Sequence, residues 1–338
     1  MQTIWIPRIG GPEVLELRDI EIPTMGNNEV LIKVRAAGVN FADLMIRKGL
    51  YPEAPPLPLI PGYEISGSIV NTGKNIQREW LDRPVVAFTR FGGYSEYVTV
   101  PTGHFFPMPG SLSYETAAGL PVAYCTAYAL IFIMGSLRSG DKLLIHNAGG
   151  AVGLAAFNLA RQIGASVYGT AGSYKHAFLK AQGFTEVFDY HHRSWSRNAL
   201  DSIQGKGFDL IIDPVGGSNW KKSYKLLGSG GRLGMYGISS ACEKKGHCIF
   251  KLLQTVFQMP LFHPLSLLNK NRGVFGVNMA RFWSEPAKIG EWMKYILSGI
   301  VDGSITPHID RFFPFSEADK AHQYIESRQN IGKIILVP

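Results

Sequence analysis

The stretch that decides the fold reads KLLIHNAGGAVGLAA and spans residues 142–156. Its apolar start ends in a glycine-rich turn, after which apolar residues recur at helical spacing as far as Ile163. A strand, a tight turn and a helix open a βαβ dinucleotide site, because small residues let the backbone approach a pyrophosphate and the helix N-terminus offers free N–H groups. The residues that we assign to this turn are Gly149, Gly150, Ala151 and Val152.

The next predicted strand, residues 166–170, indicates which nucleotide the site takes. An NAD site usually places an acidic residue about 20 residues past the glycine turn, against the ribose 2′-hydroxyl. This chain has Ser173 and Lys175 there, a hydroxyl and a cation that suit a 2′-phosphate. We therefore expect NADPH rather than NADH. The alternative is that Lys175 is a solvated lysine in the first turn of the following helix.

Length and composition favour a globular protein of two domains. The chain has 338 residues, of which 46% are hydrophobic and 18% charged. Three cysteines are too few for a disulfide framework, and no signal-peptide pattern opens the sequence, so we expect a cytoplasmic protein. The net charge of +8 suits an anionic cofactor or an anionic membrane surface. Without a basic block interleaved with aromatic residues, no nucleic-acid partner is expected.

The pattern of elements changes along the chain. Strands are predicted in the first third at 30–36, 64–71, 84–88 and 97–100, with a short helix at 42–48 and a proline-rich loop at 51–62. In the middle, strands alternate with helices, which is typical of a parallel sheet; those strands lie at 142–146, 166–170, 186–189, 208–213, 232–236 and 273–278. Two helices, at 289–298 and 316–327, precede a last strand at 333–337. The sequence thus predicts an α/β fold in which both termini build a β-rich domain and a nucleotide domain is inserted between them.

Several motifs in this order resemble the medium-chain dehydrogenase/reductase superfamily, in its zinc-independent quinone oxidoreductase branch. They include AAGVNFADLMIRKGLYP (36–52), PGYEISGSI (61–69), FGGYSEYVTVP (91–101), FDLIIDPVGG (208–217) and IGKIILVP (331–338). NFADLMIRKGLYP and the run at 213–220 resemble the vesicle amine transport (synaptic vesicle membrane) protein group most. The resemblance implies a GroES-like domain over 1–122 and 279–338, and a doubly wound Rossmann domain over 123–278 with an apolar insert near 241–271.

The zinc-binding members of the superfamily differ from this chain at their ligand positions. They carry a cysteine in the segment occupied here by residues 40–43, and a histidine in a Gly-His-Glu tripeptide. Here the tripeptide is Gly62-Tyr63-Glu64, and no cysteine precedes Cys125. Catalytic zinc needs His and Cys ligands around an open position. We therefore expect no zinc and no other metal.

The resemblance implies hydride transfer from NADPH to a quinone or an α,β-unsaturated carbonyl, with Asn40 and Tyr51 beside the nicotinamide. Tyr51 offers a phenol to a substrate carbonyl, and either solvent or Tyr51 supplies the proton. Tyr63, in place of a small residue or histidine, narrows the pocket or donates a proton. The alternatives are a turn residue for Asn40, a loop anchor on the prolines for Tyr51 and core packing for Tyr63. For Asp43 we favour a polar turn residue over an acid or base.

Further cofactor contacts are implied by the same resemblance. Thr126 matches a position near the nicotinamide and phosphate, and Lys333 a basic position near the cofactor. The 2′-phosphate and adenine side is matched by Gly172, Ser173, Lys175 and Tyr190. Contacts around the nicotinamide ribose and carboxamide are matched by Gly237, Phe275 and Val277. The family also implies a homodimer, paired through the strand at 273–278.

The apolar insert at 249–268, IFKLLQTVFQMPLFHPLSLL, approaches the length of a membrane span. Two prolines and an internal lysine argue against a span, and the basic residues around it are Lys244, Lys245, His247, Lys270 and Arg272. Three interpretations remain: a helical hairpin packed on the protein or a dimer mate, a lid over the substrate, and peripheral membrane contact through 243–270. The last gives an alternative function, a lipid- or membrane-interacting protein with little or no turnover.

Overall fold

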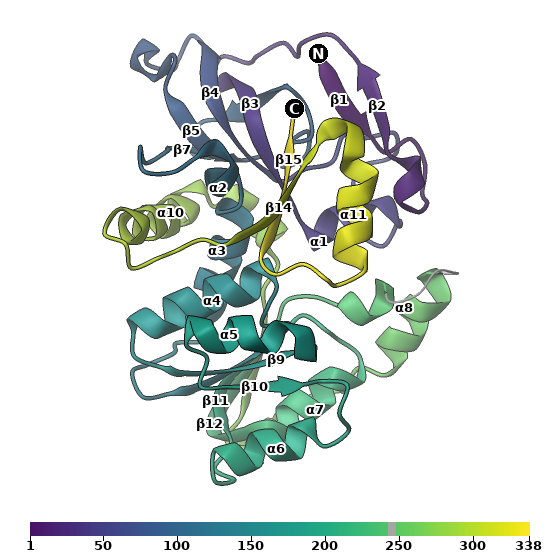
Figure 1. The fold of residues 1–338 in the computed structure, drawn as a ribbon, viewed down its shortest axis with the longest axis vertical. Helices are drawn as coiled ribbons and strands as arrows, with labels where there is room; N and C mark the ends of the chain where they lie inside the picture. The colour runs from purple at the N-terminus through teal and green to yellow at the C-terminus, as the bar shows by residue number, and fades with distance from the viewer. Residues whose placement is uncertain (243–247) are drawn as a thin grey trace. The chain divides into compact units, whose positions relative to one another are not determined.

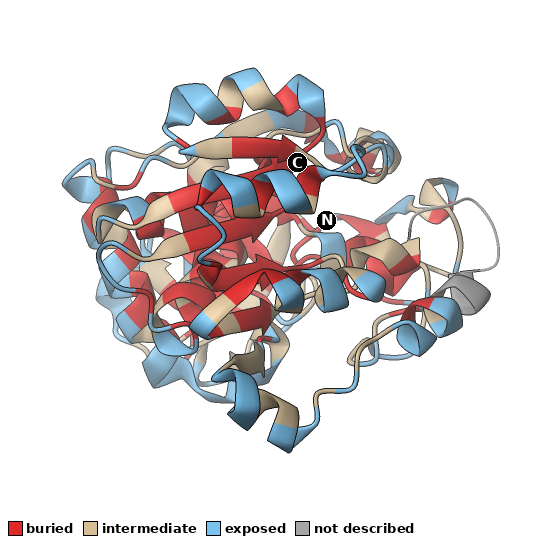
Figure 2. Ribbon diagram, turned by 90° about the horizontal axis from the view of Figure 1, so that it is seen from below, coloured by how far each residue is buried: buried red, intermediate tan, exposed pale blue. Residues whose placement is uncertain are grey.

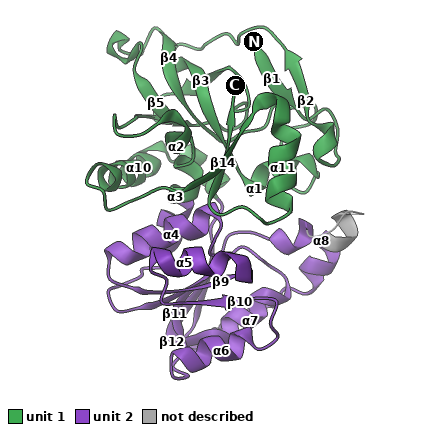
Figure 3. Ribbon diagram, in the orientation of Figure 1, with its two compact units in different colours: residues 1–125, 279–338 green, residues 126–278 purple. Residues whose placement is uncertain are grey.

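The computed structural model describes residues 1–242 and 248–338, which form two compact units (Figures 1 and 3). Unit 1 comprises Met1–Cys125 and Met279–Pro338, and unit 2 comprises Thr126–Asn278. The first border lies three residues beyond the predicted one, inside helix α3 (Pro121–Tyr128). Both termini therefore belong to the same unit, and the second unit is one continuous stretch of chain.

Unit 1 is built on a seven-stranded sheet with the order β14-β15-β3-β4-β5-β7, in which β6 also pairs with β3. Its strands are β3 (Glu29–Val39), β4 (Glu64–Thr72), β5 (Pro84–Phe88), β6 (Tyr97–Pro101), β7 (Phe105–Pro107), β14 (Ile309–Pro314) and β15 (Lys333–Val337). In β3, Ile32 and Val34 are buried while Lys33 and Arg35 are exposed, as the alternation predicts. The last strand, β15, runs antiparallel to β3. It thereby joins the end of the chain to the N-terminal strands.

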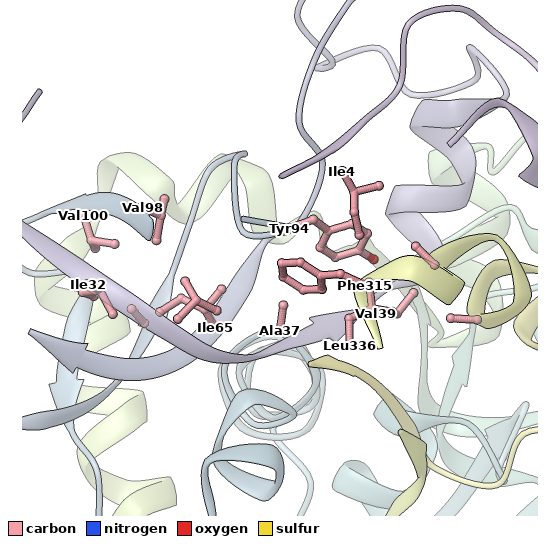
Figure 4. Packing of buried hydrophobic residues seen from close by; sticks show 14 of the residues in the cluster. Ile4, Ile32, Ala37, Val39, Ile65, Tyr94, Val98, Val100, Phe315 and Leu336 are labelled. Atoms are coloured by element: carbon pink, nitrogen blue, oxygen red, sulfur yellow. The ribbon is translucent and has the colours of Figure 1, made fainter. Parts of the chain in front are cut away.

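The core of unit 1 lies between this sheet and the elements that cover it. Ile4, Tyr94 and Phe315 pack over Ala37 and Leu336 (Figure 4). The covering elements include the hairpin of β1 (Gln2–Trp5) and β2 (Glu16–Asp19), the helices α1 (Phe41–Arg47), α2 (Tyr114–Ala118), α10 (Pro286–Val301) and α11 (Ala318–Glu326). The sequence did not predict β1, β2, β7 or β14. All four residues of β2 are exposed, so that strand carries no apolar alternation.

Unit 2 is a six-stranded parallel sheet with the order β10-β9-β8-β11-β12-β13. The strands are β8 (Lys142–His146), β9 (Ser166–Ala171), β10 (Glu186–Asp189), β11 (Phe208–Asp213), β12 (Leu227–Met235) and β13 (Gly273–Gly276). They alternate with α4 (Ala151–Gln162), α5 (His176–Gln182), α6 (Trp195–Ser202) and α7 (Ser218–Leu226). The strands are largely buried, and the helices turn exposed faces to solvent (Figure 2). This strand order confirms the predicted doubly wound fold, with its topological switch point between β8 and β11.

The apolar insert forms two short helices, α8 (Cys248–Phe257) and α9 (Pro264–Lys270). His263 precedes α9 in an extended conformation, and Pro264 opens that helix, where a proline needs no donor. None of the helices within 1–242 and 248–338 is long and apolar enough to cross a membrane. The predicted basic flank formed by Lys244, Lys245 and His247 lies outside the described residues.

Candidate active site

The glycine turn after β8 leads into α4 as the sequence predicts. Gly150 precedes α4 with an extended backbone and no side chain that caps the helix among the residues described. The first N–H groups of this twelve-residue helix are therefore available to an anion. A Cβ atom on Gly153 would lie 2.6 Å from the carbonyl oxygens of Asn147 and Ala148. Only glycine thus permits this close approach of α4 to the turn that follows β8.

The side chain of Lys175, in the loop after β9, packs against the glycine turn. Its side chain is 4% exposed and passes so close to Gly149 that a Cβ there would lie 2.7 Å from the Lys175 Cδ. The Lys175 ammonium also lies 5.4 Å from the centre of the Tyr174 ring. The alternative of a solvated lysine is therefore wrong, because Lys175 ends a short 3-10 turn (Ser173–Lys175) and its buried side chain lies over Gly149.

The other predicted cofactor residues of unit 2 lie at several of its strand ends. Ser173 and Tyr190 are exposed after β9 and β10, and the Tyr190 ring lies 4.3 Å from that of His191. Thr126 is buried near the start of the unit, and Gly237 follows β12. The Phe275 ring fills the space over Gly234, and the Val277 N–H donates to the Met235 carbonyl at 2.9 Å. Gly172 precedes Ser173 in an extended conformation.

Asn40 lies in unit 1 within a buried network that the sequence did not predict. Its Nδ2 donates to Glu64 Oε1 at 2.8 Å, and its Oδ1 accepts from Lys333 Nζ at 2.7 Å. Lys333 Nζ also donates to Glu64 Oε1, and the Val122 N–H donates to Glu64 Oε2 at 2.7 Å. Asn40 directly follows β3 and precedes α1, while Glu64 and Lys333 begin the strands on either side of β3. The orientation of the Asn40 amide is therefore fixed by one cation and one anion.

Glu64 and Lys333 form a buried ion pair, being 0% and 3% exposed. Lys333, predicted as a cofactor contact, thus lies against Glu64 and Asn40. Sequence reasoning missed the part of Glu64, although an acidic residue at the start of an apolar strand was a usable signal.

Asp43 holds together the two segments that carry Asn40 and Tyr63. Its Oδ2 accepts from the Asn40 N–H at 2.8 Å and from the Tyr94 hydroxyl at 3.1 Å, while its Oδ1 accepts from the Gly62 N–H at 3.1 Å. Burial raises the pKa of Asp43 to about 6, although these hydrogen bonds and Lys333 oppose the rise. These contacts favour the interpretation of Asp43 as a polar residue that fixes local structure.

Tyr51 and Tyr63 are brought together in a small aromatic cluster. Their ring centroids are 6.0 Å apart, and the Tyr63 ring lies 5.3 Å from that of Phe91. The Tyr63 hydroxyl is buried and has no hydrogen-bond partner at normal distance among the described residues; the Tyr51 hydroxyl is near enough to act on it only as a weak acceptor. Burial raises the pKa of both tyrosines, so both hydroxyls are protonated at neutral pH. Tyr63 therefore presents a donor that, in the described chain, faces only the weak acceptor of Tyr51.

Possible metal ligands do not gather in the part of the chain that the structure describes. No group of three or more His, Cys, Asp or Glu side chains lies close enough to hold an ion there. The carboxylate of Glu64, next to Tyr63 in the tripeptide, is engaged by Lys333, Asn40 and Val122 as given above.

Comparisons with known proteins place the chain in a family. Residues 26–110 match the family described as "Alcohol dehydrogenase GroES-like domain", and residues 182–336 match that described as "Zinc-binding dehydrogenase". The synaptic vesicle membrane protein VAT-1 homolog of Rattus norvegicus is 36% identical over 325 residues, which are 96% of this chain and 80% of that protein. The quinone oxidoreductase of the same species is 32% identical over 341 residues, which are 100% and 98% of the two chains.

Solved structures agree with these sequence matches. The crystal structure of Escherichia coli quinone oxidoreductase complexed with NADPH has a TM-score of 0.88 and 26% identity, and each chain is fully covered. The human synaptic vesicle membrane protein VAT-1 homolog-like protein has a TM-score of 0.87 and 27% identity, with 100% of this chain and 98% of that chain covered. The predicted resemblance is therefore confirmed: the chain belongs to the medium-chain dehydrogenase/reductase family of oxidoreductases, in its quinone oxidoreductase-like branch.

Proposed function

We propose that the protein is an NADPH-dependent, zinc-independent oxidoreductase that transfers hydride to a quinone or an α,β-unsaturated carbonyl. The observation that carries the proposal is the position of Lys175 over Gly149, beside the uncapped start of α4. A cation and free N–H groups at one sheet edge suit a ligand with a pyrophosphate and a further phosphate. The relatives whose structures contain NADPH support the same choice of cofactor.

The fit to NADPH rests on groups that the chain itself supplies. The α4 N-terminus and the turn of Gly149, Gly150, Ala151 and Val152 receive the pyrophosphate. Lys175 and Ser173 receive the 2′-phosphate. The residues proposed for the adenine and nicotinamide ends are Thr126, Gly172, Tyr190, Gly237, Phe275 and Val277. When bound, NADPH supplies the hydride, and the protein supplies position and electrostatics.

On the substrate side we propose Tyr63 and Tyr51 as hydrogen-bond donors to the acceptor's oxygen. The Tyr63 hydroxyl has no hydrogen-bond partner at normal distance in the described chain, so it gains a full hydrogen bond when a carbonyl or quinone oxygen approaches and gives up only the weak interaction with Tyr51. The proton then comes from Tyr51 or from solvent. Asn40 shapes the same site, with its amide held by Glu64 and Lys333. This donor set polarises the substrate oxygen.

The test is the oxidation of NADPH by the purified protein against a panel of quinones and enones, with NADH measured in parallel. We expect turnover with NADPH and a preference for NADPH that Lys175→Ala reduces at least tenfold. Lys180→Ala, at an exposed position of the following helix, is the matched control and leaves the preference unchanged. Binding of neither cofactor by the wild-type protein would refute the proposal.

A second candidate function is peripheral contact with membranes, favoured by the apolar side chains of the insert. Phe257 and Leu261 are 93% and 100% exposed, and Leu265 and Leu268 are also exposed. Apolar groups of this kind insert into the interfacial region of a bilayer. We expect the protein to float with phosphatidylserine-containing vesicles and Leu261→Ser to float less, whereas Leu81→Ser, at an exposed leucine of unit 1, behaves as wild type. Equal flotation of all three proteins would reject this role.

For the assembly we propose a homodimer formed through β13. This strand is the last in the sheet order of unit 2, so among the described strands one of its edges is unpaired. Light scattering during gel filtration tests the proposal, and we expect twice the mass of 37.2 kDa. A mass of one chain at micromolar concentration would contradict it.

A further inference from the structure

Four buried polar side chains lie at the C-terminal edge of the parallel sheet of unit 2. His146 ends β8, Asp213 ends β11, and Thr170 is the next-to-last residue of β9. Ser223, from the middle of α7, reaches the same place. None of the four is more than 2% exposed. No step proposed above uses them.

The hydrogen bonds of Asp213 set the direction of this network. Its Oδ1 accepts from the Val215 N–H at 2.7 Å, and its Oδ2 accepts from Asn219 Nδ2 at 2.7 Å. The Ser223 hydroxyl lies 2.7 Å from the same Oδ2. A carboxylate only accepts, so the single Ser223 proton points to Asp213.

The direction of the remaining bonds follows from the Ser223 proton. His146 Nε2 lies 3.0 Å from Ser223 Oγ and must donate, because the proton of that hydroxyl is already used. Burial lowers the pKa of His146, so the ring is neutral and its Nδ1 carries a lone pair. The Thr170 hydroxyl, 2.9 Å from Nδ1, therefore donates to it. The chain of donors runs from Thr170 through His146 and Ser223 to Asp213.

This chain of hydrogen bonds crosses the switch point of the sheet. The strands β9, β8 and β11 are neighbours, and the two halves of the fold diverge between β8 and β11. The glycine turn starts directly after His146, and the loop that carries Ser173 and Lys175 starts after Ala171. Asp213 also fixes the start of the next loop through the Val215 N–H. One hydrogen-bonded chain thus anchors three loops at their bases.

We propose that Thr170, His146, Ser223 and Asp213 are positioning residues that set the spacing of the nucleotide-binding loops across the switch point. This inference rests on the proposed function, because the loops are those that we assign to NADPH. The chain of bonds requires the Nε2–H tautomer of His146. Removing the Ser223 hydroxyl breaks the chain of hydrogen bonds between the loop after β8 and the loop after β11, and it leaves the buried Asp213 carboxylate with one donor fewer.

The test combines NADPH titration by fluorescence with ¹⁵N spectra of histidine-labelled full-length protein. We expect His146, assigned with His146→Gln, to show a neutral ring with the proton on Nε2 at pH 7 and without cofactor. Ser223→Ala is expected to raise the Kd for NADPH about tenfold, and the nearly isosteric Thr170→Val about threefold. The matched control is Ser202→Ala, which removes a hydroxyl that donates to the Ala199 carbonyl within α6, and its Kd stays unchanged.

The outcomes separate this inference from the proposed function. Wild-type protein that does not bind NADPH overturns both. Wild-type binding with an unchanged Kd in folded Ser223→Ala and Thr170→Val overturns the positioning role alone, since a purely structural network lowers stability without moving the Kd. A proton on Nδ1 of His146 overturns the direction of the chain. If Ser223→Ala does not fold, Thr170→Val and the tautomer decide.

Discussion

The buried pair of Glu64 and Lys333 leads to a prediction about stability that a double-mutant cycle measures. The changes are Lys333→Met, which keeps the length of the side chain without its charge, and Glu64→Gln, which keeps its shape. In either single variant one charge stays buried opposite a neutral group. The double variant has no buried charge at this position. The Asn40 amide, no longer held by the Lys333 ammonium, can turn over so that its oxygen accepts from the amide nitrogen introduced by Glu64→Gln, whose oxygen still accepts from the Val122 N–H.

The expected magnitudes follow from this burial. Removing one partner of a buried ion pair costs about 3–5 kcal/mol, and replacing both by neutral groups costs far less. Each remaining charge here keeps a hydrogen bond to Asn40, so we expect the lower value, about 3 kcal/mol, for each single variant. With about 2 kcal/mol for the double variant, the coupling energy is about 4 kcal/mol.

Urea unfolding at pH 7 measures the cycle, with the denaturant slope compared among the four proteins so that only like transitions enter it. The matched control is Lys320→Met, which removes a cation from the exposed pair with Glu317 and is expected to leave the midpoint unchanged. The reasoning is refuted if the loss in the double variant equals the sum of the two single losses within about 0.5 kcal/mol. Such additivity would mean that Glu64 and Lys333 do not stabilise one another.

Three further predictions concern individual residues. The pKa of Asp43 is about 6 in the folded protein and 3.8 as its ordinary value, so the folded state binds this proton more tightly than the unfolded state does. The stability of the wild type relative to Asp43→Asn therefore increases as the pH falls through 6, by up to about 3 kcal/mol. Equal stability differences in urea at pH 7.5 and pH 5 would contradict this. Tyr63→Phe removes a buried hydroxyl that has no partner at normal distance among the described residues, so we expect unchanged or higher stability and about a tenfold lower kcat/KM for quinones at unchanged NADPH affinity. A clear loss of stability would show that the interaction with Tyr51 is a full hydrogen bond. In Gly149→Ala the new Cβ displaces the Lys175 side chain, so the preference for NADPH over NADH is expected to fall. The control Gly110→Ala, whose Cβ meets nothing within 4 Å, is expected to keep the preference. If Gly149→Ala also keeps it, Lys175 does not determine which cofactor binds.

The elements that were predicted well are those whose signal is local. β5, β8, β10, β11 and β15 were predicted with the bounds that the structure gives them, because short apolar runs there end at clear turn residues. β12 begins at Leu227, five residues before the predicted start, within a stretch rich in glycine that hides a strand. The hairpin strand β2 has no buried face to detect. Local patterning thus decides which strands a sequence reveals.

In the candidate site, too, the features with a local sequence signal were predicted and those that depend on tertiary contacts were not. The glycine turn and Ser173 with Lys175 are local motifs, so their approximate place followed from spacing alone. The burial of Lys175 against Gly149 did not, since it depends on how the short turn before α5 directs the side chain. The pairing of Glu64 with Lys333 joins positions 269 residues apart, and only the sheet order brings them together.

The pairing of β15 with β3 also governs the order in which the chain is able to fold during synthesis. The nucleotide unit is continuous, so all its strands have emerged once residue 278 has left the ribosome. The first unit, in contrast, cannot complete its sheet until β15 is made, because β15 pairs with β3 and carries Lys333, the cation that pairs with Glu64. Folding as units from the N-terminus onward is the general tendency of multidomain chains. In this chain, unit 2 can therefore be completed before unit 1. Until β15 is made, the N-terminal sheet of unit 1 has an unpaired edge at β3, which exposes backbone hydrogen-bonding groups.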